Sequence, residues 1–173
     1  MIGIPLGLLY ANAGEWLVHK YILHGLGKRK RSYWSFHWHE HHKTVRQEAM
    51  RDSNYEESVF RWNGQGKEAL GLIAAGLVHL PLLPIAPFFT GTYLYSLYNY
   101  YRVHKRAHLD PEWAREHVPW HYDHHMGPEQ NRNWCVTRPW FDELMGTRVP
   151  YVGTERERRD REAREAREAR TAG

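Results

Sequence analysis

Histidine provides most of the side chains in this sequence that could do chemistry. Thirteen of the 173 residues are histidine, and ten of them fall into four short groups. Imidazole is the commonest metal ligand that proteins use at neutral pH. Ten imidazoles exceed what one metal ion needs and suit two, so the sequence predicts a centre with two metals held by nitrogen. The four groups are His19 and His24; His37, His41 and His42; His104 and His108; and His121, His124 and His125.

The spacing within each group predicts which histidines share a metal. On an α-helix, side chains three or four residues apart lie on one face. His104 and His108 should therefore share a face, and so should the three histidines of residues 121–125. His19 and His24 are five residues apart, so we expect them to splay apart and either embrace one site from two sides or flank two metals.

The second group leaves a choice of ligand open. His37 lies one helical turn before His41, which predicts that these two are neighbours, and His42 is displaced by one residue step, which lets it reach a second metal. His39 is the alternative to His37, because it lies three residues before His42. We favour His37, since His39 and His41 would point well apart on a helix.

Carboxylates beside the groups are candidates for orienting the imidazoles. A metal-bound histidine usually gives its other N–H to a carboxylate or a carbonyl. Glu15 lies one turn before the first histidine, and Glu40 and Asp123 lie within the second and fourth groups. The alternative for these carboxylates is a solvated surface position. Among the remaining histidines, we expect His79 to be a packed core residue and His117 to lie at the surface.

The ligand types narrow the choice of metal. A nitrogen-only set suits zinc, copper, iron or nickel. Zinc sites usually take four ligands, and zinc does no redox chemistry. Ten imidazoles in two sites leave positions open for oxygen, which favours a dinuclear iron centre over a pair of structural zinc ions. Cys135 is the single cysteine, so a cysteine-based zinc site and a disulfide within the chain are excluded.

Two apolar stretches must position these groups. Residues 1–17 contain only Asn12 and Glu15 as strongly polar side chains, and residues 69–89 contain a single ionisable one. Apolar runs of about 18 residues or more are candidates for crossing a membrane. The first stretch leads directly into His19, so we expect it to remain as an anchor rather than to be removed as a signal peptide.

Prolines divide the second apolar stretch. A helix over residues 67–80 would cover about 20 Å at 1.5 Å per residue, which is short of a hydrocarbon core of about 30 Å. Because Pro81, Pro84 and Pro87 break helical hydrogen bonding, we expect a turn followed by a return helix over residues 89–107. The fold class predicted is therefore all-α: an integral membrane protein with a short N-terminal anchor, a proline-broken helical hairpin and a cytoplasmic histidine-rich helical cap.

The charged residues predict which side of the membrane the site faces and where the domain ends. The basic run of residues 28–31 follows the first apolar stretch, which predicts that this loop and the site lie on the cytoplasmic side. We expect no nucleic-acid partner, because the run adjoins an apolar segment and no stacking motif accompanies it. Residues 1–153 are predicted to form one domain. Residues 154–173 alternate Glu and Arg, which predicts a charged helical or disordered tail.

The order and spacing of the four groups resemble the signature of the fatty acid hydroxylase superfamily, which includes sterol desaturases, lipid hydroxylases and carotenoid ring hydroxylases. A closing segment over residues 133–147 is similar as well. The second group departs from the commonest spacing by one extra residue. The matching segments are His19-Lys-Tyr-Ile-Leu-His24, His37-Trp-His-Glu-His41-His42, His104-Lys-Arg-Ala-His108 and His121-Tyr-Asp-His124-His125.

The resemblance implies an enzyme that uses two iron ions (zinc being possible in a purified sample) and O₂ as co-substrate to hydroxylate or desaturate a C–H bond. The implied substrate is a membrane lipid such as a fatty acyl chain or a sterol. A carotenoid ring hydroxylase is the alternative, since residues 19–25 resemble bacterial members of that kind. The sequence has no glycine-rich dinucleotide turn, so an external electron donor is implied, of the ferredoxin type or of the cytochrome type with a reductase. A non-redox membrane zinc-binding protein and an inactive metal-binding member are the competing interpretations.

Overall fold

The chain is an all-α protein in the computed structural model, which describes residues 1–172. No strand occurs among these residues. Two short 3₁₀ segments, η3 (Ser53–Glu56) and η4 (Leu80–Leu82), lie in connections. The other helical elements are α1 (Gly3–Leu17), the π-helical segments η1 (Val18–Leu26) and η2 (His37–His41), α2 (His42–Gln47), α3 (Gly64–His79), α4 (Pro87–Leu109), α5 (Pro111–His117), α6 (Pro119–Met126), α7 (Trp140–Leu144) and α8 (Glu155–Ala172).

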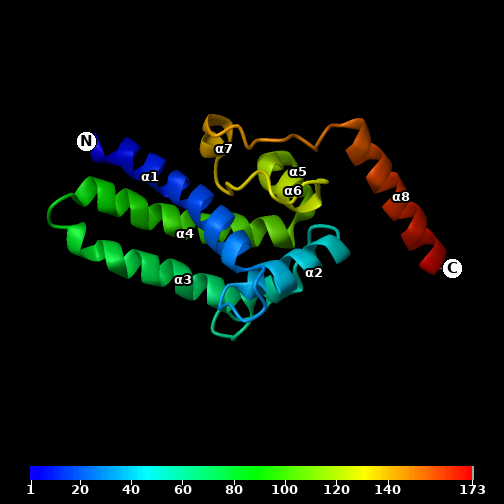
Figure 1. The fold of residues 1–173 in the computed structure, drawn as a ribbon, viewed down its shortest axis with the longest axis horizontal. Coiled ribbons are helices and arrows are strands. Elements are labelled where there is room, and N and C mark those ends of the chain that lie inside the picture. The colour runs from blue at the N-terminus through cyan, green and yellow to red at the C-terminus, as the bar shows by residue number, and fades with distance from the viewer. Residues whose placement is uncertain (173) are drawn as a thin grey trace.

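Three long helices, α1, α3 and α4, form one half of the molecule (Figure 1). α3 ends at His79 and α4 begins at Pro87, so the prolines produce the turn that the sequence predicts. α1 packs closely along α4. A Cβ atom on Gly3 would lie 2.8 Å from the backbone nitrogen of Phe89, and one on Gly7 would lie 2.9 Å from its carbonyl oxygen. These two glycines therefore permit the close contact that aligns α1 with α4.

Apolar side chains remain exposed on all three of these helices. Val78 near the end of α3 is 76 % exposed, and Ile85 in the turn is 80 % exposed. None of the described helices combines the length and the apolarity needed to span a membrane. The physical reason lies in the breaks: α3 stops after 16 residues, and the second half of α4 is polar.

Shorter helices gather at the other end of α1 and α4, where α2, α5 and α6 meet (Figure 1). The stretch of residues 111–126 is two helices, because Pro119 begins α6 and the chain turns at Val118. An apolar core at this end contains Val45, Met50, Ala107, Ala114, Val118, Tyr122, Met126 and Tyr151.

The charged tail is helical over the described part. α8 contacts the rest of the chain through ion pairs rather than through an apolar face. The Nε atom of Arg115 lies 2.5 Å from Oε1 of Glu157, whose side chain is almost fully buried. Arg161 pairs with Glu112 on α5 at 3.1 Å. These contacts attach the first turns of α8 to α5.

Candidate metal centre

The first histidine pair lies on a π-helical turn. In η1 the backbone N–H of Gly27 donates to the carbonyl of Ile22, five residues earlier, at 2.9 Å. Such i→i+5 bonding places residues five apart on one face. His19 and His24 therefore point into the same cluster of imidazoles, and their ring centroids lie 5.0 Å apart. Of the two arrangements expected for this pair, the structure has the one in which both imidazoles serve one site, and it does so because the helix changes its period at this point.

The second group follows the same rule. η2 is also π-helical, so His37 and His42, five residues apart, face the same cluster, and His41 faces a different one. The α-helical expectation, in which His37 and His41 are neighbours and His42 reaches the second metal, is therefore reversed. His39 lies outside both clusters, with its Nε2 atom 3.1 Å from the carbonyl oxygen of Lys28.

The structure brings nine of the ten predicted ligands into two buried clusters. Within each cluster, one nitrogen from every imidazole lies within 4.8 Å of all the others. The tenth, His121, lies at the edge of cluster B, where its Nε2 atom is 3.1 Å from Nε2 of His108. Cluster A contains His19, His24, His37, His42 and His124, and cluster B contains His41, His104, His108 and His125.

The two clusters adjoin one another through α6. His124 belongs to cluster A and its neighbour His125 to cluster B, with ring centroids 4.9 Å apart. His42 and His125 bring the two clusters closer still, at 4.5 Å. The expectation that the histidines of residues 121–125 form one patch is therefore wrong, because α6 lies between the clusters and serves both. His104 and His108 do share cluster B, as their spacing predicts.

Backbone carbonyls orient three of the imidazoles. The Nδ1 atoms of His19, His108 and His124 lie 2.6, 2.9 and 2.7 Å from the carbonyl oxygens of Trp134, Met50 and Arg132 respectively. A carbonyl oxygen can only accept, so each Nδ1 carries the proton and donates it. In the neutral ring this leaves Nε2 as an unprotonated nitrogen that points into the cluster.

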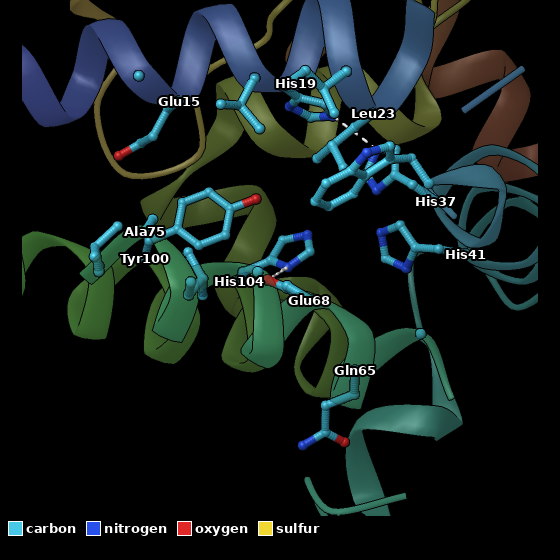
Figure 2. A pocket seen from close by; sticks show the side chains of 18 of the residues that line it. Glu15, His19, Leu23, His37, His41, Gln65, Glu68, Ala75, Tyr100 and His104 are labelled. Carbon is cyan, nitrogen blue, oxygen red and sulfur yellow. Dashed lines mark hydrogen bonds and ion pairs between the residues drawn. The ribbon is translucent and has the colours of Figure 1, made fainter. Parts of the chain in front are cut away.

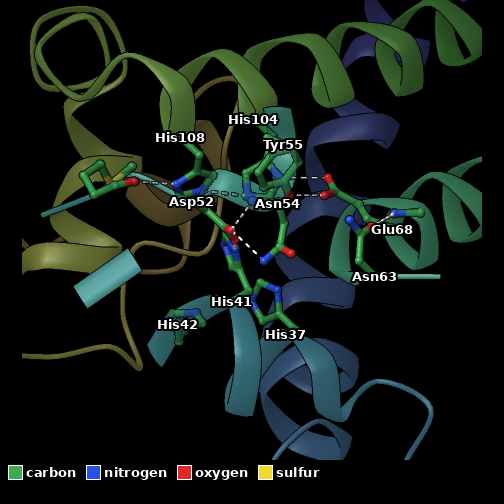
Figure 3. Close-up of polar contacts among 12 residues, drawn as sticks. His37, His41, His42, Asp52, Asn54, Tyr55, Asn63, Glu68, His104 and His108 are labelled. Atoms are coloured by element: carbon green, nitrogen blue, oxygen red, sulfur yellow. Dashed lines mark hydrogen bonds and ion pairs between the residues drawn. The ribbon is translucent and has the colours of Figure 1, made fainter. Parts of the chain in front are cut away.

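Two carboxylates orient two further imidazoles, both in cluster B (Figure 3). Nδ1 of His41 lies 2.8 Å from Oδ2 of Asp52, and Nδ1 of His104 lies 2.8 Å from Oε1 of Glu68. The hydroxyl of Tyr55 donates to Glu68 and lies 3.0 Å from Nδ1 of His104. The sequence did not identify these partners, since they come from a polar loop and from the second turn of α3, without a helical spacing to any histidine.

The three carboxylates predicted for this role lie elsewhere. Glu15 accepts hydrogen bonds from the backbone N–H groups of Val136 and Thr137, both at 2.9 Å, and thereby holds the closing segment against α1. Asp123 pairs with Arg148 at 2.6 Å, and Glu40 is exposed. The predictions are wrong. A carboxylate on the same helix face as a histidine can still pair with stronger donors in the neighbouring loops, as Glu15 and Asp123 do.

Two other histidines lie outside the clusters. Nε2 of His79 lies 3.0 Å from the hydroxyl of Tyr10, and its Nδ1 lies 2.7 Å from the carbonyl oxygen of Ala75. His117 is exposed and stacks on Trp113, with ring centroids 5.1 Å apart. His117 therefore lies at the surface, as expected, whereas His79 packs against Tyr10 but is only partly buried and not in the core.

The donor set fits two metal ions. Nε2 of His104 and Nε2 of His108 face each other at 3.2 Å, although both rings donate their Nδ1 protons elsewhere. Two lone pairs at this distance repel unless a cation lies beside them. Two nitrogens that are each about 2.1 Å from one ion, at roughly a right angle, lie about 3 Å apart. The corresponding Nε2 distances in cluster A are 3.0 to 3.2 Å.

The protonation state of the imidazoles and their unpaired nitrogen atoms also fit two bound metal ions. Burial lowers the pKa of His42, His124 and His125 well below the usual range, so these rings are neutral at neutral pH, the form that binds metal. Nε2 of His41 and both ring nitrogens of His125 are buried without a hydrogen-bond partner among the described residues. Buried polar atoms in a native protein are normally paired, and a coordinated ion would pair these.

An apolar cavity of about 220 Å³ reaches both clusters. It lies between α1, α3 and α4, with His19 and His37 of cluster A and His41 and His104 of cluster B at one end (Figure 2). Most of the other lining side chains are aliphatic, aromatic or glycine. The arrangement thus presents one face of both clusters to an apolar ligand while helices cover the sides.

Comparison with models of protein families identifies a relationship for this chain. A family model described as fatty acid hydroxylase matches residues 4–147, a span that includes all ten predicted ligands. Neither the curated proteins nor the solved structures gave a match to this chain.

Proposed function

The chain belongs to the fatty acid hydroxylase family, and from this premise we propose that it is a di-iron, O₂-dependent oxidoreductase that hydroxylates or desaturates a C–H bond of a lipid, such as a fatty acyl chain or a sterol. The observation that carries the proposal is the contact between two adjacent nitrogen-only clusters and one apolar cavity. An all-imidazole set suits iron, and an apolar cavity suits the hydrocarbon part of a lipid.

Clusters A and B would each hold one ion, with His121 available at the edge of cluster B. When bound, the two iron ions would supply O₂ activation and the oxidising equivalents for the C–H bond. Asp52 and Glu68 hold His41 and His104 in the tautomer that presents Nε2. Loss of either carboxylate is therefore expected to affect cluster B before cluster A.

The cavity would bind and orient the lipid. Its aliphatic lining includes Leu23, Leu72 and Leu97, and it excludes water from the side of the clusters where the C–H bond would lie. Gly14 on α1 lines the same cavity, and a Cβ atom there would meet nothing within 4 Å. The absence of a side chain at this position leaves room for the lipid.

The exposed apolar side chains support a membrane location for the α1 and α3–α4 end. Exposed apolar surface of this kind marks membrane or protein contact sites, and it includes Val78 and Ile85 as well as Leu6 and Leu9 on α1. We propose that this end is embedded in the bilayer and that the histidine-rich end lies at its cytoplasmic face. The exposed basic residues 28–31 would favour anionic lipid heads and the docking of an acidic, external electron donor.

Lipid profiling tests this function. Cells that express the full chain should accumulate a lipid that has gained one oxygen atom or lost two hydrogens, relative to cells without it. The H124A variant should abolish the product, because it removes a cluster A nitrogen, whereas H117A should not, because His117 is exposed and outside both clusters. A product confined to carotenoids would assign the ring hydroxylase instead, and a zinc-loaded protein that transforms its lipid without O₂ would overturn the proposal.

A further inference from the structure

Helix α4 forms a polar wall of the apolar cavity. Tyr93, Ser96, Tyr100 and His104 all line it, at spacings of three, four and four residues, which place them on one face of the helix. The walls formed by α1, η1 and α3 are largely small or aliphatic, with Ala11, Gly14, Val18, Gly71, Leu72 and Ala75. The two carboxylates on these walls, Glu15 and Glu68, are hydrogen-bonded within the protein. A plain hydrocarbon chain would need no such polar wall.

Most polar groups around the cavity are satisfied by the protein itself. The hydroxyl of Ser96 donates to the carbonyl of Thr92 at 2.8 Å, and the hydroxyl of Tyr55 donates to Glu68. The hydroxyls of Tyr93 and Tyr100 differ, because neither has a hydrogen-bond partner among the described residues, although these side chains are only 8 % and 9 % exposed. A polar group in such surroundings is normally paired, so each hydroxyl is available to a partner that enters the cavity.

The position of Tyr100 places that partner near the clusters. Its ring centroid lies 5.4 Å from that of His104, one turn further along α4, with an angle of 33° between the ring planes. Figure 2 shows the ring of Tyr100 extending into the cavity beside His104, between Glu15 and the histidines. The carboxylate of Glu15 is occupied by the closing segment. The free donor therefore points at the end of the cavity where both clusters are accessible.

We propose that the Tyr100 hydroxyl forms a hydrogen bond with an oxygen atom of the lipid, and that the site thereby selects a lipid whose hydroxyl or carbonyl group lies close to the oxidised carbon over a plain hydrocarbon. This rests on the proposed function in one respect, namely that the cavity is the lipid site. Tyr100 acts as a positioning residue: the hydrogen bond fixes how far the lipid extends past His104 and so which carbon faces the clusters.

Binding of two matched probes tests the inference without turnover. The full chain, as isolated in detergent, is titrated with hexadecan-1-ol and with hexadecane, and the ratio of the two dissociation constants is compared between the wild type and Y100F. A hydrogen bond of ordinary net strength changes affinity by about two- to tenfold. Y100F should therefore weaken the alcohol by that factor and leave hexadecane unchanged. Comparing ratios cancels the different solubilities of the probes in detergent.

Y98F is the matched control, since Tyr98 lies on the same helix but is 63 % exposed. It should leave the ratio at the wild-type value. An unchanged ratio in Y100F, equal weakening of both probes, or an equal effect of Y98F would each overturn the inference; a hydroxyl that merely holds a water molecule predicts the unchanged ratio. Because no product is formed, a wild-type protein that shows the alcohol preference but oxidises no lipid would contradict the proposed function and leave this inference standing.

Discussion

Asp52 offers the sharpest perturbation of the candidate metal centre. Its Oδ2 atom accepts from Nδ1 of His41 at 2.8 Å, and its Oδ1 atom accepts from the backbone N–H of Asn54 at 3.0 Å. Burial raises the pKa of Asp52, but the hydrogen bonds from His41 and Asn54 and the nearby imidazoles together outweigh burial and hold that pKa below its usual range, so the carboxylate is charged at neutral pH. The Asp52→Asn change keeps the shape and the bond to Asn54 while it replaces the acceptor for His41 with a donor.

The size of the effect follows from this contact. An amide N–H facing Nδ1 of His41 favours the tautomer with the proton on Nε2, which is the nitrogen that points into cluster B. Loss of a carboxylate that orients a ligating histidine typically costs about 10- to 100-fold in metal affinity. This corresponds to about 1.4 to 2.7 kcal/mol. We expect the loss to fall on cluster B, because cluster A has no contact with Asp52.

Metal binding measured by competition with a chelator, with metal content determined by mass spectrometry, is the assay. D52N should lose one of two ions at a chelator concentration that leaves the wild type loaded. D110N is the matched control, because Asp110 also accepts from the first turn of a helix (Trp113 N–H, 3.1 Å) but is exposed and has no hydrogen bond to a histidine among the described residues. Retention of both ions by D52N, or equal loss of both, would refute the assignment of His41 to a separate cluster B.

Three further predictions address the ligand choice, the cavity and the tail. H37A should lower the metal content and H39A should not, as metal analysis of the two purified variants will show; the reverse result would exchange their roles. Gly14→Leu should weaken lipid binding at least tenfold with unchanged metal content, because its side chain would enter the cavity; unchanged affinity would move the lipid site elsewhere. Arg115→Ala should lower the melting temperature, since it removes the ion-pair partner of the buried Glu157 at a cost of about 2 kcal/mol; an unchanged melting temperature would contradict this.

A control accompanies the cavity variant. Gly91 on α4 is exposed, and a Cβ atom there would also meet nothing within 4 Å. Gly91→Leu should therefore leave both lipid affinity and metal content unchanged. If it weakens lipid binding as much as Gly14→Leu does, the effect comes from added helix bulk and not from the cavity.

Local sequence signals predict much of the fold. The prolines between residues 80 and 87 determine where α3 ends and α4 begins, because a proline within a helix removes a hydrogen bond whatever surrounds it. The break between α5 and α6 has the same cause at Pro119. The apolar composition led us to expect a membrane-spanning helix, and none of the described helices is long and apolar enough. Such a helix requires an uninterrupted apolar length, which these breaks remove.

The sequence predicted which histidines gather at the site better than it predicted which of them share a cluster. The spacing identifies the histidines because ligands of one site must recur on one face of a helix. Our assignment of these histidines to clusters, however, assumed the period of an α-helix. The five-residue separation of His19 and His24 was itself a signal of a π-helical turn, and applying the same period to His37 and His42 places them in one cluster. Asp52 and Glu68 carried no such signal, because tertiary packing alone brings them to His41 and His104.

The most direct test of the central claim is oxidation of a lipid by the purified, iron-loaded full chain supplied with reductant and heavy-isotope O₂. Two iron ions per chain are expected, one for each cluster. We expect an O₂-dependent product that either carries one labelled oxygen atom or lacks two hydrogens. This product should disappear when H124A removes a ligand of cluster A or when H108A removes a ligand of cluster B. A product that forms equally well without O₂, or that takes its new oxygen from water, would contradict the account.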